Sequence, residues 1–78
     1  MIMVHRIKGV VKYWDLGRER AFGLIKIDAK DEEDFNNQLE KEFKKHLMSH
    51  DISFANGMVV VGGFRKVGNF EFIAKEED

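Results

Sequence analysis

The chain has 78 residues, which is enough for one domain and too few for two. It contains no cysteine, so disulfides, thiolate nucleophiles and cysteine-ligated zinc are excluded. A core of this size leaves little room for a deep catalytic pocket, so we expect no enzyme. The formal net charge is −1, whereas nucleic-acid-binding domains are usually basic overall.

No apolar run approaches the ~20 residues that a membrane span needs. The apolar start, residues 1–4, is followed at once by His5, Arg6 and Lys8. We therefore expect a single domain over residues 1–78 that is cytoplasmic, has no signal peptide and has no contact with a membrane.

Charge is distributed unevenly along the chain. Residues 1–27 hold six basic and two acidic side chains, a charge of +4. Residues 28–43 hold seven acidic and two basic side chains, a charge of −5. A like-charged run is usually a solvated surface, so the acidic stretch is not by itself a site.

The first third of the chain predicts two strands. Residues 4–14 mix β-branched and aromatic residues with polar ones, which favours a long strand with a bend at Gly9. A turn follows at residues 16–19, around Gly17. Residues 21–27 then alternate. One face carries Phe22, Leu24 and Lys26, and the other carries Ala21, Gly23, Ile25 and Ile27, which suit a tight barrel interior.

The middle of the chain changes period. Phe35, Leu39, Phe43 and Leu47 recur every four positions behind the capping candidates Asp31 and Asp34, which predicts a helix over 32–42. From Lys44 onward the pattern also fits one face of a strand, and we place that strand at 44–50.

The last third predicts the remaining strands. A turn at Asn56-Gly57 precedes a strand at 58–61. A bend at Gly62-Gly63, a hairpin at 65–69 and a strand at 70–73 precede a charged tail at 75–78. Five short strands with one helical interruption predict an all-β fold, a closed five-stranded antiparallel barrel.

Two runs carry a family resemblance: Lys8-Gly9-Val10-Val11-Lys12-Tyr13-Trp14-Asp15 and Arg20-Ala21-Phe22-Gly23-Leu24-Ile25. They resemble the opening of cold-shock domains, which reads approximately G-x-V-K-W-F-N and then K-G-F-G-F-I. The resemblance places Lys12 and Tyr13 on the family's basic and Trp contact positions, and Trp14 on its following Phe. Arg20 takes the Lys position and Phe22 the first Phe, while Leu24 replaces the second Phe and should weaken stacking.

The family's second motif, F-V-H-x-S-x-I, has a degenerate counterpart in residues 46–52. There His46 stands at the Phe and Met48 at the His. The acidic stretch 28–43 enlarges the connection that precedes this strand. The resemblance implies an OB-type, cold-shock-like barrel that binds single-stranded RNA or DNA.

The chemistry of such a site agrees with these residue types. Unstacked bases need flat aromatic faces, worth ~1–3 kcal/mol each, beside cations that neutralise phosphates. The candidate nucleic-acid-binding residues are Lys8, Lys12, Tyr13, Trp14, Arg20, Phe22, Leu24, Lys26, His46 and Met48. The alternative is that Tyr13, Phe22 and Leu24 lie buried beneath the helix; Phe54 and Phe64 are further platform candidates for which a core position is favoured.

Other chemistry is weakly indicated. His46 and His50 have helical ligand spacing, but with no paired carboxylate motif or cysteine we expect no metal and no cofactor. Ser49 and His50 are adjacent, and adjacent residues of a strand face opposite ways, so no catalytic pair is expected.

A second function of a different class stays open: a protein-interaction module on the same barrel, which meets its partner through the acidic insert or an exposed strand edge. We expect the insert to pack on the barrel through Phe35, Leu39 and Phe43. Four of its acidic side chains should be directed away from the face that carries Lys12 and Arg20: Glu32, Glu33, Glu40 and Glu42. The alternative is that it folds over that face as a phosphate mimic.

Overall fold

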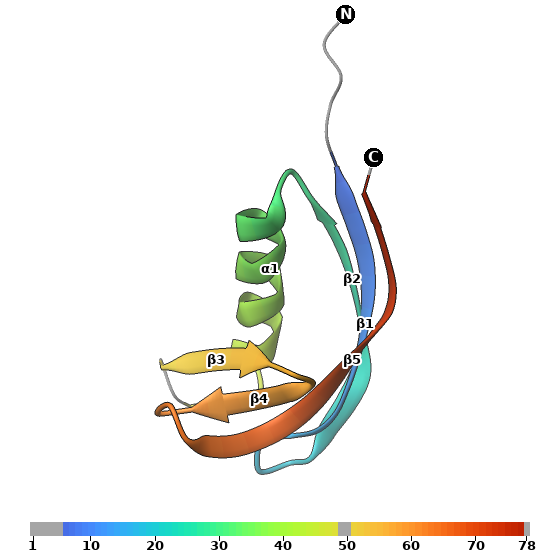
Figure 1. The fold of residues 1–78 in the computed structure, drawn as a ribbon. Coiled ribbons are helices and arrows are strands. Elements are labelled where there is room, and N and C mark those ends of the chain that lie inside the picture. Colours follow the sequence, from blue (N-terminus) through green and yellow to red (C-terminus); the bar gives the residue numbers. More distant parts are fainter. Residues whose placement is uncertain (1–5, 49–50, 78) are drawn as a thin grey trace, which may run out of the picture.

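A computed structural model describes residues 6–48 and 51–77 of the chain. Along the chain the elements are β1 (Ile7–Leu16), β2 (Ala21–Ala29), α1 (Glu32–Lys44), β3 (Ile52–Ala55), β4 (Met58–Val61) and β5 (Arg65–Glu77), shown in Figure 1. In this part of the chain, no helix is both long and apolar enough to cross a membrane.

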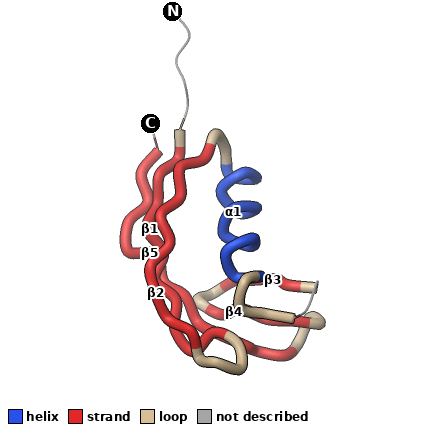
Figure 2. Tube along the Cα trace, turned by 180° about the vertical axis from the view of Figure 1, so that it is seen from behind, coloured by secondary structure: helices blue, strands red, loops and turns tan. Residues whose placement is uncertain are grey.

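The strands form one antiparallel sheet in the order β2-β1-β5-β4-β3. Each hairpin pairs two strands that follow each other in the chain, β1 with β2 and β3 with β4. The long strand β5 pairs with both β1 and β4 and so joins the two hairpins. The sheet curves so that α1 lies on its concave side (Figure 2), where it contacts both β2 and β3. The mostly β prediction with one helix is confirmed. Closure of a barrel is not shown, because no ladder joins β2 to β3 in the residues described.

Two tight turns shape the hairpins, and both use backbone conformations that favour glycine. Between β1 and β2, Gly17 has φ +73° and Arg20 has φ +52°. Between β3 and β4, Asn56 and Gly57 have φ values of +53° and +79°, the two-residue loop that Asn-Gly predicts. The second turn is held against β5 by the Phe70 backbone N–H, which donates to the Gly57 carbonyl at 2.9 Å.

Helix α1 begins where the sequence predicts and runs two residues further, to Lys44. Asp31 caps it, because its carboxylate accepts a hydrogen bond from the Asp34 backbone N–H at 2.7 Å. The first turn is acidic and the last turn is basic, which complements the helix dipole. As predicted, the helix packs on the sheet through the fully buried side chains of Phe35, Leu39 and Phe43.

The core lies between α1 and the concave face of the sheet, which we call the inner face. Alternate residues of each strand reach it, so Ile25 and Ile27 are buried while their neighbours are exposed. The other buried side chains are those of Ile7, Val11, Leu16, Ala29, Val59 and Phe70. Burial of these apolar side chains, at roughly 25 cal/mol per Å², is the main stabilising contribution available to a chain without disulfides.

The strand expected at 44–50 is wrong for the residues that the structure describes. Residues 45–47 continue the helix end through i to i−3 backbone hydrogen bonds: Lys45 to Glu42, His46 to Phe43 and Leu47 to Lys44. Positions 49–50 lie outside the described residues. The strand forms later, at Ile52–Ala55.

The hairpin expected at 65–69 is also wrong. The chain turns earlier, at residues 62–64, where Gly62 and Gly63 have φ values of +62° and +81°. Gly68 therefore lies within β5 and not in a turn. It faces Leu16, and a larger residue would not fit there, because an added Cβ would lie 2.5 Å from Leu16 Cδ1. Residues 75–77 of the expected charged tail belong to the same strand, which pairs with β1 as far as Glu77; residue 78 lies outside the described residues.

Candidate nucleic-acid interface

Six of the ten candidate residues lie on one surface, the convex side of β1 and β2. The register pairs Lys12 with Leu24, while the neighbouring pair of Val11 and Ile25 is buried on the inner face. Alternation then places the other candidates of both strands on the convex side. We call this surface the outer face; its residues are Lys8, Lys12, Trp14, Phe22, Leu24 and Lys26.

The aromatic and aliphatic side chains of the outer face are open to solvent. Phe22 is 82% exposed and Leu24 is 64% exposed. Trp14 is half-buried, and the Lys12 ammonium lies 5.8 Å from the centre of its ring. A cation above an aromatic ring at this distance is a favourable contact. Helix α1 packs on the opposite side of the sheet, so the insert does not cover this surface.

The charges of the outer face are balanced along β1. Lys12 pairs in register with Glu71 of β5, and Lys8 with Glu76 of β5 and Asp28 of β2. Among the residues described, no ion pair joins either lysine to these carboxylates; Asp28 pairs instead with Arg6 at 2.8 Å. Arg18 and Arg20 are exposed in the turn between β1 and β2, where the exposed Asp15 and Glu19 balance their charge.

Tyr13 does not share the outer face, which corrects the expectation that it forms one platform with Phe22. It pairs in register with Gly23 and points to the inner face, where its hydroxyl lies 3.3 Å from His46 Nε2. Its ring centre lies 5.5 Å from that of His46 and 6.4 Å from that of Phe43. Gly23 makes this possible, because an added Cβ would lie 2.8 Å from the Tyr13 hydroxyl.

The last two candidates follow α1 and do not join the outer face. His46 lies against Tyr13 on the inner side, as described above. Met48 is 95% exposed in the loop after the helix. Their expected strand does not form among the described residues, so His46 and Met48 are not displayed on the sheet.

Sequence reasoning missed Ile73, an apolar residue next to β1. A β-bulge makes it the extra residue of β5 between the partners of Val10 and Val11, and its side chain is 55% exposed. A register irregularity of this kind has no signal in an alternating sequence pattern.

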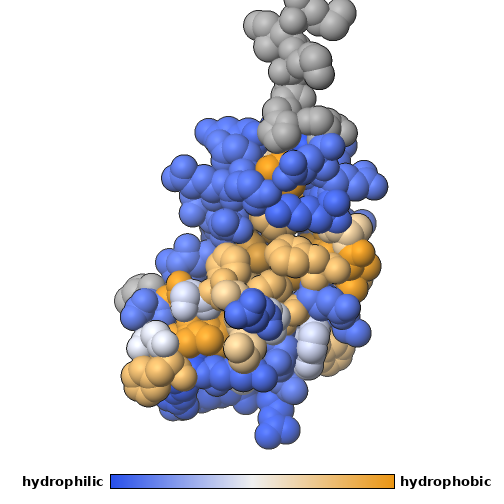
Figure 3. Space-filling model, in the orientation of Figure 1, coloured by the Kyte–Doolittle hydropathy of each residue, from blue (hydrophilic) through white to orange (hydrophobic). Residues whose placement is uncertain are grey.

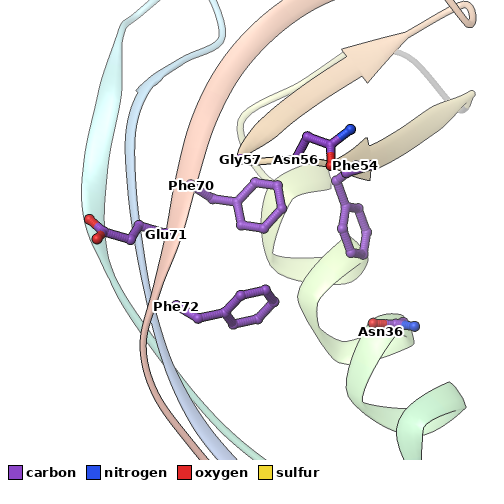
Figure 4. Close-up of a pocket in the computed structure, with 8 residues that line it drawn as sticks. Asn36, Phe54, Asn56, Gly57, Phe70, Glu71 and Phe72 are labelled. Atoms are coloured by element: carbon purple, nitrogen blue, oxygen red, sulfur yellow. The ribbon is translucent and has the colours of Figure 1, made fainter.

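A separate pocket opens on the inner side, between α1, the β3–β4 turn and β5 (Figure 4). Its volume is about 440 Å³, and Phe54, Phe70 and Phe72 form its aromatic walls beside Asn36. The Phe70 ring is perpendicular to that of Phe54 at 5.8 Å and nearly so to that of Phe72 at 5.6 Å. Figure 3 shows apolar residues gathered across the middle of this view of the molecule, with hydrophilic residues above them.

No group of three or more histidine, aspartate or glutamate side chains that could hold a metal occurs among residues 6–48 and 51–77. Of the two histidines with helical ligand spacing, His46 lies in this part of the chain and His50 lies outside it. Comparison of the chain with protein-family models, with curated proteins and with solved structures finds no match.

Proposed function

We propose that this chain binds single-stranded nucleic acid, RNA or DNA, through the outer face. The observation that carries the proposal is that Phe22 and Leu24 stand exposed beside Lys12, Trp14 and Lys26 on one continuous surface. Exposure of an apolar ring such as that of Phe22 to water is unfavourable, and a flat partner that covers the ring removes this cost. Bases supply such a partner, and the lysines beside it suit the phosphates.

The resemblance to cold-shock domains supports the same proposal. Both runs that carry it, residues 8–15 and 20–25, fall within the β1–β2 hairpin that builds the outer face. The proposal regards the chain as a cold-shock-like, OB-type domain in which α1 is an insertion between β2 and the remaining strands. Trp14 and Phe22 take the stacking roles, since Tyr13 lies on the inner side.

Binding is tested by fluorescence anisotropy of a labelled oligothymidylate at low salt. Wild-type protein should raise the anisotropy, and Phe22→Ala should weaken affinity by ~1–3 kcal/mol, a factor of about 5 to 150. The matched control is Phe64→Ala, because Phe64 is 89% exposed but lies in the turn between β4 and β5. Absence of wild-type binding, or equal losses in the two variants, would refute the proposal.

A second candidate function is a protein interface on the same outer face. It is favoured by the acidic residues of β5 that stand in register with Lys8 and Lys12, because they reduce attraction to phosphates. The two functions differ in their response to salt. Oligonucleotide affinity falls steeply with salt, whereas apolar association through Phe22 and Leu24 is nearly indifferent to it. Self-association that survives 0.5 M salt and is lost in Phe22→Ser, without oligonucleotide binding, would establish the protein interface.

A further inference from the structure

A second groove runs between the edge strand β2 and the C-terminal half of α1. It has a volume of about 270 Å³ and is lined by Ile25, Lys26, Ile27, Gln38, Lys41, Glu42 and Lys45. Ile25 and Ile27 are buried beneath it, and polar groups provide most of its accessible surface. With three lysines and one glutamate, the lining residues carry a charge of +2.

The lysines of this groove have few competing partners. In the part of the chain that the structure describes, Lys26 and Lys41 form no ion pair, and Lys45 pairs with Glu42 at 3.0 Å. Three of the five acidic residues of α1 lie in its first turn, at the other end of the helix. Residues 40–45 hold three lysines against Glu40 and Glu42, a charge of +1, and this end of the insert borders β2.

Lys26 connects the groove to the outer face. It belongs to the exposed side of β2, next to Leu24, and it also lines the groove. Because β2 ends the strand order, no further strand covers this edge in the described residues. A chain of phosphates that leaves Phe22 and Leu24 can pass over the β2 edge and meet Lys41 and Lys45 without crossing the acidic first turn.

We propose that Lys41 and Lys45, together with Lys26, contact the phosphates of the bound strand, so that α1 takes part in binding. This inference rests on the proposed function. The ligand chemistry is the phosphodiester group, and its source is a continuous strand, because the groove continues an exposed stacking surface. The lysines also offset the partial negative charge at the C-terminal end of the helix, which alone would repel an anion.

The test compares two variants of the full chain by anisotropy with the labelled oligothymidylate over a range of NaCl concentrations. Lys41→Gln with Lys45→Gln should weaken binding at least threefold at low salt. It should also make the slope of log affinity against log salt shallower by about 1.4, at roughly 0.7 for each lost phosphate contact. The control is Lys44→Gln, because Lys44 pairs with Glu40 at 3.6 Å and does not line the groove. Thermal unfolding of each variant verifies that the fold is retained.

Each outcome bears on a separate claim. If Phe22→Ala weakens binding but the double variant keeps the wild-type slope, the inference is wrong and the proposed function stands. If the wild type does not bind, the proposed function fails, and the inference fails with it. Inorganic phosphate should compete only as strongly as NaCl at equal ionic strength; stronger competition would show a site for the free anion and overturn the role of the strand.

Discussion

Gly9 of β1 lies directly beneath the ring of Phe35, so Gly9→Ala should force the helix and the sheet apart. An added Cβ would lie 2.7 Å from Phe35 Cε2 and 2.8 Å from Cζ. The ring is fully buried and cannot swing away freely, because Phe72 lies 6.1 Å from it and the Lys75 ammonium 5.0 Å. Overpacking of this kind costs about 1–3 kcal/mol. The lower entropy of the unfolded chain returns about 0.4–1 kcal/mol.

The expected net loss is about 1–2 kcal/mol in the free energy of unfolding, measured by urea denaturation with circular dichroism. Phe35→Leu removes the two ring atoms that clash. The loss of stability in the double variant Gly9→Ala with Phe35→Leu should therefore be smaller than the sum of the two single losses, by a coupling energy of about 0.5–3 kcal/mol. Gly23→Ala serves as the comparison, because its clash is with the hydroxyl end of the half-buried Tyr13, which can rotate. A Gly9→Ala protein as stable as the wild type, or strictly additive losses, would refute this reasoning.

Substitutions at three further positions test the helix and its contacts. Phe43→Ala should cost about 3–5 kcal/mol in urea denaturation, because this fully buried ring supports several others; a loss under 1 kcal/mol would contradict its place in the core. Asp31→Ala should lower stability by about 0.5–2 kcal/mol through the lost cap on Asp34, and Asp31→Ser should restore most of it in a thermal melt. Lys75→Met breaks the 2.9 Å ion pair with Glu32, so its loss, at most about 1 kcal/mol at low salt, should shrink in 1 M NaCl; a loss that does not change with salt would argue against an electrostatic origin.

The elements that were predicted well are those with an undisturbed period. In β2, Ala21–Ala29, less exposed and exposed side chains alternate without interruption. In α1, Phe35, Leu39 and Phe43 recur at helical spacing behind a capping aspartate. The error at 44–50 arose because a helix that ends in a turn leaves the same alternation of polar and apolar residues as a short strand. Here hydrogen bonds from Lys45, His46 and Leu47 back into α1 decide the matter, and they have no separate sequence signal.

The composition of the candidate site was only partly predictable. Adjacent residues of a strand face opposite sides, so Tyr13 and Trp14 cannot both belong to the outer face. The family resemblance assigned both to binding, and the pairing of Tyr13 with Gly23 places Tyr13 inside. The groove that Lys41 and Lys45 line could not be inferred from the chain, because it depends on which edge of the sheet the helix covers.

The ladder between β1 and β5 also bears on how the molecule forms. Ile7 pairs with Glu77, so contacts at the centre of the sheet join segments separated by nearly the whole described chain. The β1–β2 hairpin is local and can form early, whereas this ladder must wait until β5 is available and then close a long loop. During synthesis β1 therefore has one unpaired edge until β5 leaves the ribosome. The apolar inner residues of β1 remain exposed to other chains over that interval.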